Sequence, residues 1–432
     1  MEAWIALSGL AVWRGIRFPW ALPRALLVRP FGPQMNTASE IHSDLVLRNA
    51  HVVDPSQDIS GVLDVAVLNG TVAALGPSLE VPAGTAERDL SGSYVCPGLI
   101  DLHGHWYESS AWGIDPEFCL HRGSTTVIDA GTAGCINFAD FRRQVIERSR
   151  IRVLAFVNIA ASGIPTSFIG ELEDLRYSRP RETIAVLEEH RGVALGVKVR
   201  MKAGHGPKAF DDALEAAGAA ALPVMVHIGK GANTPDILRR LRPHDIVTHC
   251  FEGRGDGIVE QGRLIPEAVQ ARKEGVVFDV GHGCGSFSWE VARRAFEHSF
   301  YPDTISTDLH RYSVERWAFD MPTTMSKFLH LGMSLEDVIL KSTLTPAKAI
   351  GRDGELGSLR VGTVADFFAF ALEEGEFPLE DTHLKVEVAK QRIKPLFAMK
   401  AGAVIEATSG GQRLRKLYDF DCEQLRSIEE TA

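Results

Sequence analysis

Apolar and polar positions divide the chain into three stretches with different periods. From 44 to 95, short runs of alternating apolar and polar residues are separated by turns, and Asn69-Gly70 is a strong hairpin signal. From 96 to 350, short apolar runs alternate with longer amphipathic stretches, which predicts strands and helices around a parallel sheet. From 351 to 407 the strand-and-turn pattern returns. We therefore expect both ends of the chain to meet in one small β-sandwich domain.

The central stretch contains eight apolar runs that predict strands. They are 97–105, 124–131, 151–159, 193–200, 222–229, 244–250, 275–283 and 303–310. Eight strands alternating with helices over about 250 residues are the content of an α/β (β/α)8 TIM barrel, whose active site lies at the carboxyl ends of the strands. Functional side chains are therefore expected where these runs end.

Two terminal segments fit neither pattern. Residues 1–43 show no helix or strand period, lack the features of a secretory signal, and are expected to be a disordered extension, with Met35 as a candidate start. Residues 408–432 are expected to form a tail with a short helix and no catalytic part.

Composition and charge narrow the class of protein. A chain of 432 residues with 45% hydrophobic and 24% charged residues is in the globular range. Its net charge of -10 argues against nucleic-acid binding, and no apolar run is long enough to span a membrane. Six cysteines without a CxxC pair argue against a zinc knuckle or a disulfide framework, so a cytoplasmic protein is expected. We expect a homo-oligomer that acts on a small molecule.

Histidines stand at the ends of three predicted strands. His103 and His105 end the first run, and alternate strand residues project to one face, so both imidazoles can hold one metal ion. His227 ends the fifth run and His249 ends the sixth. A histidine in any one of these places could equally be a hydrogen-bonded core residue. The argument for a metal site is that all four would converge at one end of the barrel.

An aspartate and a lysine complete this group. Asp308 closes the eighth run and could coordinate a metal and shuttle a proton, or only cap the next helix. Lys198 lies inside an apolar strand, where burial lowers the pKa of an amine. A neutral amine can react with carbon dioxide to give a carbamate that bridges two metal ions. The alternative is a buried lysine–carboxylate pair.

Two further residues are candidate substrate contacts. Arg200 follows Lys198 by two positions, so its guanidinium would face the same side and could bind a substrate carboxylate, or form a structural salt bridge. His282 follows the seventh strand between two glycines, in a loop that could approach a ligand or be a simple turn.

These motifs together resemble the amidohydrolase superfamily. The resemblance runs from 44 to about 407 and rests on PGLIDLHGH, the lysine on the fourth strand, the histidines on the fifth and sixth, the aspartate on the eighth, and the passage from Pro346 to Asp366. Within the superfamily, GSTTVIDAGTAG, GVKVR and ISTDLH are most similar to the amidohydrolase/deacetylase members of the dihydroorotase-like branch. It implies two divalent metal ions, most often Zn²⁺, bridged by carboxylated Lys198. It implies His103, His105 and Asp308 on one ion, and His227 and His249 on the other, with Asp308 as the catalytic proton shuttle.

The resemblance implies hydrolysis of an acyl bond, in an amide or an ester. An N-acyl amino acid or an O-acetyl hydroxy acid is the expected substrate, and opening of a cyclic amide, as in dihydroorotase or hydantoinase chemistry, is the alternative. A non-catalytic scaffold relative is the alternative of another class. The filled set of ligand positions argues against a scaffold.

Overall fold

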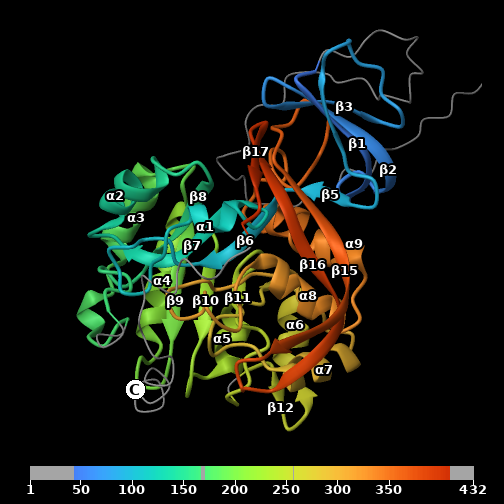
Figure 1. Cartoon of the computed structure of the whole chain (residues 1–432). Coiled ribbons are helices and arrows are strands. Elements are labelled where there is room, and N and C mark those ends of the chain that lie inside the picture. The colour runs from blue at the N-terminus through green and yellow to red at the C-terminus, as the bar shows by residue number, and fades with distance from the viewer. Residues whose placement is uncertain (1–42, 167–170, 256, 409–432) are drawn as a thin grey trace, which may run out of the picture. The chain divides into compact units, whose positions relative to one another are not determined.

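A seven-stranded parallel sheet forms the framework for the candidate site. The computed structural model describes residues 43–166, 171–255 and 257–408. The strands lie in the order β14-β11-β10-β9-β8-β7-β6. Figure 1 shows β9, β10 and β11 side by side. Their bounds are β6 Leu99–Gly104, β7 Ser124–Gly134, β8 Arg152–Asn158, β9 Ala194–Met201, β10 Val224–Ile228, β11 Ile246–Thr248 and β14 Val277–Phe278. Most of their residues are buried, as is typical of parallel strands that are covered on both faces.

The eighth predicted strand joins the two edges of this sheet without forming a regular strand. Thr304 makes a parallel bridge with Asp279 just after β14, and Leu309 makes one with Gly104 at the end of β6. Between them Asp308 has a φ of 48°, which interrupts an extended conformation. The parallel order and these bridges fit a barrel-like domain, whereas a regular eighth strand is not formed.

Helices connect the strands, and several begin with a side-chain cap. The longer ones are α3 Pro180–Glu189, α4 Lys208–Ala220, α5 Thr234–Arg240, α6 Pro266–Lys273, α7 Trp289–Glu297 and α8 Met321–His330. The shorter ones are α1 Glu117–Leu120, α2 Phe138–Phe141, α9 Leu335–Leu340 and α10 Leu344–Ala349. A short π-helix spans Arg142–Ile146 and a short 3₁₀ helix spans Leu175–Tyr177. Ser288 caps α7 and Asp320 caps α8, because each side chain accepts a backbone N–H of the first turn. No helix in the described part of the chain is long and apolar enough to cross a membrane.

A second sheet draws strands from both ends of the described chain. Its order is β17-β16-β15-β5-β1-β2-β3, and β4 pairs with β1. The strands are β1 Leu45–Asp54, β2 Ile59–Leu68, β3 Thr71–Gly76, β4 Ala86–Asp89, β5 Tyr94–Pro97, β15 Phe367–Glu380, β16 Val386–Lys400 and β17 Ala403–Glu406. A separate pair joins β12 Val259–Glu260 and β13 Arg263–Leu264. Because β5 pairs with β15, the two ends meet as the sequence predicts (Figure 1).

Some predictions on the small domain stay open. Its strands form one continuous hydrogen-bonded sheet, so the two-layer sandwich and its boundaries at 44–95 and 351–407 remain predictions. Nearly all of the expected extension and nearly all of the expected tail lie outside the described residues. The Asn69-Gly70 turn does connect β2 to β3, with φ values of 48° and 73° that suit such a hairpin.

The long hairpin of β15 and β16 reaches from the second sheet to α8. The backbone N–H of Ile393 in β16 donates to Ser326 Oγ in α8 at 2.9 Å. The carbonyl of Glu380, the last residue of β15, accepts a hydrogen bond from Lys327 Nζ of the same helix. The C-terminal hairpin therefore contacts the helix that follows the eighth predicted strand.

We predict that Gly70→Ala destabilises the protein more than Gly84→Ala does. Both glycines have positive φ, 73° and 90°, so each alanine costs about 1–2 kcal/mol in backbone strain. A Cβ at position 70 would also lie 2.7 Å from the carbonyl oxygen of Ala401, whereas a Cβ at position 84 meets nothing within 4 Å. Urea unfolding should show an additional loss of about 1–3 kcal/mol for Gly70→Ala. Equal losses of stability in the two variants would contradict a tight contact between Gly70 and Ala401.

Candidate metal centre

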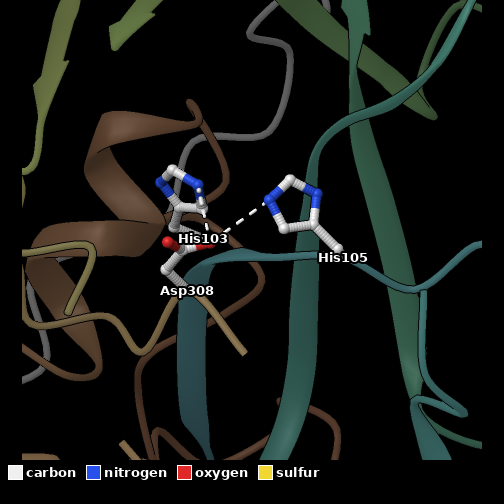
Figure 2. Close-up of side chains that lie close together, drawn as sticks. All are labelled: His103, His105 and Asp308. Carbon is white, nitrogen blue, oxygen red and sulfur yellow. Dashed lines mark ion pairs between the residues drawn. The ribbon is translucent and has the colours of Figure 1, made fainter. Parts of the chain in front are cut away.

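Three side chains from distant parts of the sequence meet at the carboxyl end of the parallel sheet. His103 and His105 come from the end of β6 and Asp308 from the segment beside it. Asp308 Oδ1 lies 3.4 Å from His103 Nε2 and 3.2 Å from His105 Nε2 (Figure 2). One ligand atom from each residue lies within 4.8 Å of the others, and all three residues are buried. This group could hold a metal ion.

Two further histidines extend the group. His249, which follows β11, has its ring centroid 4.9 Å from that of His103. His227, near the end of β10, has its centroid 4.1 Å from that of His249. Four of the predicted ligand residues therefore form a continuous set of rings, although they come from three different strands.

Lys198 lies within electrostatic reach of all four histidines. It is in β9, is 2% exposed, and its Nζ donates to the carbonyl of Ala130 at 3.2 Å. Burial lowers its pKa, which favours the neutral amine that carbamate formation requires. Gly131 makes room for the lysine, since a Cβ there would lie 2.6 Å from Lys198 Cβ.

The histidines are held in the neutral form that binds metal. Burial is the largest cause that lowers the pKa of each of the four, and the nearby charge of Lys198 also lowers each pKa. For His105 the pKa falls to about 4. A neutral imidazole keeps one ring nitrogen with a lone pair, which is the form that ligates a cation.

Hydrogen bonds determine which ring nitrogen faces the centre. His103 Nδ1 is 2.7 Å from Thr248 Oγ1, and that hydroxyl donates to Asp279 Oδ2 at 2.9 Å. Because the threonine proton goes to the carboxylate, the hydroxyl accepts from His103 Nδ1–H and leaves Nε2 as the free acceptor. Thr132 Oγ1 contacts His105 Nδ1 at 2.7 Å in a similar position. Such partners orient metal-binding histidines.

Asp279 is the buried carboxylate that accepts the hydrogen bond from Thr248. It also accepts hydrogen bonds from Thr304 Oγ1 at 2.6 Å and Ser306 Oγ at 2.7 Å. Burial raises its pKa to about 6, against the effect of the three hydroxyl donors. The carboxylate therefore connects His103, through Thr248, to the segment that carries Asp308.

The backbone around two of the candidate ligands is strained. His249 has a φ of 64° and Asp308 a φ of 48°, in the left-handed region that non-glycine residues seldom adopt. His249 Nδ1 donates to the carbonyl of Gly281 at 2.6 Å, which helps to keep the ring in place. Strain of this kind is concentrated at functional sites.

The two predicted substrate contacts have different surroundings. Arg200 is partly buried and lies beside His227 in the register of β9 and β10. Its Nε is buried without a hydrogen-bond partner, and no residue of the described ranges forms an ion pair with it, so the structural salt bridge is not seen there. His282 is fully buried, and its Nε2 lies 2.7 Å from Lys327 Nζ. Its role as a substrate contact stays a prediction.

Sequence reasoning missed several residues near the centre. Asn158 ends β8 and donates to Glu171 Oε2 at 2.7 Å, and the charge of Glu171 opposes the burial that lowers the pKa of Lys198. Asn158 could have been found by the strand-end rule, whereas Glu171 lies in a loop with no pattern. His310, two residues after Asp308, has its ring centroid 6.1 Å from that of His105. His205 Nε2 is buried without a partner among the described residues.

The donor set fits a divalent metal ion. It consists of neutral imidazole nitrogens and a carboxylate oxygen that lie within a few ångströms of one another. In two of the histidines, Nδ1 contacts a threonine hydroxyl group, which orients the ring. Zinc, manganese, iron and cobalt all accept such mixed nitrogen and oxygen ligands.

Comparisons with known proteins show the family to which the chain is similar. Residues 94–412 match the model of the amidohydrolase family. A deacetylase from Agrobacterium fabrum is 37% identical over 361 residues, which cover 81% of this chain and 88% of the relative.

Two solved structures are also similar along most of the chain. One is described as a dihydroorotase, with a TM-score of 0.79 and 33% identity, and the match covers 84% of this chain and 99% of the other. Another is described as an adenine deaminase, with a TM-score of 0.78 and 30% identity, and covers 84% and 100%.

We predict that Thr248→Val weakens zinc binding about 10- to 100-fold, because His103 Nδ1 loses the hydroxyl that orients it. Thr126→Val is the matched control. Its hydroxyl is buried and has no hydrogen-bond partner among the described residues, so the change removes no bond. Competition titration with a chromophoric chelator measures both affinities. Equal affinities in the two variants would contradict the role of Thr248.

Proposed function

This chain belongs to the amidohydrolase family, and we propose that it is a metal-dependent deacetylase acting on a small molecule that carries a carboxylate. The family and its deacetylase relatives make it a hydrolase of C–N or acyl bonds. The observation that carries the finer proposal is the group of four histidines, Lys198 and Asp308, all buried except the half-buried His227, with the unpaired guanidinium of Arg200 beside it. The substrate class would be an N-acyl amino acid or an O-acetyl hydroxy acid.

The proposed centre holds two ions. His103, His105 and Asp308 would bind one, His227 and His249 the other, and Lys198, as its carbamate, would bridge them. Two divalent ions, with zinc as the expected metal, would activate a water molecule and polarise the acyl carbonyl. Burial lowers the pKa of Lys198, which supports carbamate formation, in which the amine adds to carbon dioxide and releases a proton.

Asp308 is the proposed proton carrier. Its Oδ1 faces the two histidines of β6, so the carboxylate is next to the place where the attacking water would be bound. It would accept the proton of that water as the new C–O bond forms. It would then give this proton to the leaving nitrogen or oxygen as the acyl bond breaks.

Arg200 is the proposed anchor for the substrate carboxylate. A guanidinium presents a planar set of donors that matches a carboxylate, and here no described residue is paired with it. A partly buried cation without a partner is costly, and an anionic substrate would compensate that cost. The carboxylate would orient the acyl group towards Asp308.

Cyclic amide opening is the second candidate, supported by the similarity to a structure described as a dihydroorotase. The same metal centre would serve both reactions, so only tests with different substrates can distinguish the two activities. The direct experiment is a screen of the zinc-loaded protein against acylated amino acids, acetylated hydroxy acids, hydantoins and dihydroorotate. Turnover of only the last two classes would overturn the deacetylase proposal. Absence of bound metal together with no turnover would favour a scaffold.

We predict that Asp308→Asn retains most of the bound metal and loses turnover by about 10²- to 10⁴-fold, because an amide can still offer an oxygen ligand but cannot carry the proton. Metal content by atomic emission and kcat on the best substrate are the measurements. Near-normal kcat would rule out Asp308 as the proton carrier.

We predict that Arg200→Met raises KM for a carboxylate substrate about 10- to 100-fold, the effect of losing a hydrogen-bonded ion pair. The methyl ester of the same substrate should show the same KM with both proteins. Arg176→Met is the control variant, since Arg176 pairs with Asp174 on the surface. An unchanged KM for the carboxylate would show that another group binds it.

A further inference from the structure

A second buried lysine has no part in the chemistry proposed above. Lys327 of α8 is 0% exposed. Its Nζ lies 2.7 Å from each of three acceptors, which are His282 Nε2, the carbonyl of Trp317 and the carbonyl of Glu380. An ammonium group has three donors, so every one of them is used. A buried cation bonded in this way holds its acceptors in fixed positions.

The contact with Lys327 fixes the ring of His282. An ammonium can only donate, so His282 Nε2 is the acceptor and the ring proton is on Nδ1. Nδ1 lies 3.0 Å from the carbonyl of Gly283, which accepts that proton. The ring also stacks on Phe287, with centroids 4.6 Å apart and planes at 20°. Both nitrogens and one face of the ring are therefore occupied.

The glycines on either side of His282 contact two proposed metal ligands. The carbonyl of Gly281 accepts the hydrogen bond from His249 Nδ1 at 2.6 Å. A Cβ on Gly283 would lie 2.4 Å from Asp308 Oδ2, so this backbone is packed directly against the carboxylate. The backbone N–H groups of Gly281 and His282 donate to Ser306, and that of Gly283 donates to the carbonyl of Thr307. Because glycine has no side chain, His282 supplies the only side chain that anchors this segment.

We propose that Lys327 is a positioning residue for the metal centre. It holds His282, His282 holds the segment 281–283, and this segment holds His249 and Asp308 in their ligating positions. Since Glu380 ends β15, the C-terminal hairpin helps to place the catalytic aspartate from outside the barrel-like domain. The proposal rests on the proposed function, because it assumes that His249 and Asp308 bind the metal.

The test compares Lys327→Met with Lys400→Met in cobalt-loaded enzyme. Lys400 is also a largely buried lysine, but it pairs with Asp366 at 2.6 Å in the second sheet. We expect Lys327→Met to shift the visible cobalt spectrum and to lower kcat about 10- to 100-fold with a smaller change in KM. Lys400→Met should keep the wild-type spectrum and kcat.

The outcomes separate this proposal from the proposed function. If wild-type enzyme binds cobalt and Lys327→Met has the same spectrum and kcat, the positioning role is wrong. If wild-type enzyme binds no cobalt, the metal centre itself is wrong. His282→Phe is a second variant, which keeps the stack on Phe287 and leaves Lys327 two carbonyl acceptors, and it should give a spectral shift in the same direction. An unchanged spectrum in soluble His282→Phe would also overturn the proposal.

A chemical rescue tests whether the ammonium group itself is needed. Lys327 lines a cavity of about 450 Å³ together with Trp317, Phe377 and Ile393, which gives a small molecule access to the position. The atoms that Lys327→Ala removes from the side chain are the same as those of a propylammonium ion. Added n-propylamine should restore the cobalt spectrum and kcat, whereas n-propanol should not. Equal restoration by both would show that Lys327 acts only by filling space.

Discussion

The removal of water from a small set of ionisable groups is the constraint on which this structure depends. Four histidines, Lys198 and Asp308 lie close together, and burial lowers the pKa of the imidazoles and of the amine. Neutral nitrogen donors beside one carboxylate repel a cation far less than protonated ones would. A largely buried, preorganised group of donors is therefore suited to bind a divalent metal ion.

The candidate metal ligands must also be oriented. Hydroxyl groups and glycines of the surrounding structure hold them in position. Thr248 and Thr132 contact the Nδ1 atoms of His103 and His105, which leaves each Nε2 directed at Asp308. Gly131 lets the chain approach Lys198 at a distance that no side chain would permit. The strained φ values of His249 and Asp308 are kept because the hydrogen bonds around them oppose relaxation.

The two sheets are connected by side-chain contacts as well as by the chain itself. The second sheet is built from both ends of the described chain, and its long hairpin reaches α8, where Lys327 contacts His282. The small domain therefore contributes an acceptor to Lys327, which contacts the loop packed against His249 and Asp308. The three acceptors of this buried lysine come from three separate segments of the chain.

The sequence by itself determined the order of the parallel strands and the positions of the candidate metal ligands. Periodicity predicted the parallel strands and the meeting of the chain ends, because burial imposes a repeat that a single sequence displays. The strand-end rule located His103 and His227, since parallel strands end on the same side of a sheet. It also predicted the position of Asp308, although the segment that carries Asp308 is not a regular strand. Only the tertiary structure decided that the eighth segment is irregular, that His282 contacts Lys327, and that Glu171 lies near Lys198. Those contacts join residues from separate loops and helices, and no local pattern encodes a distance between them.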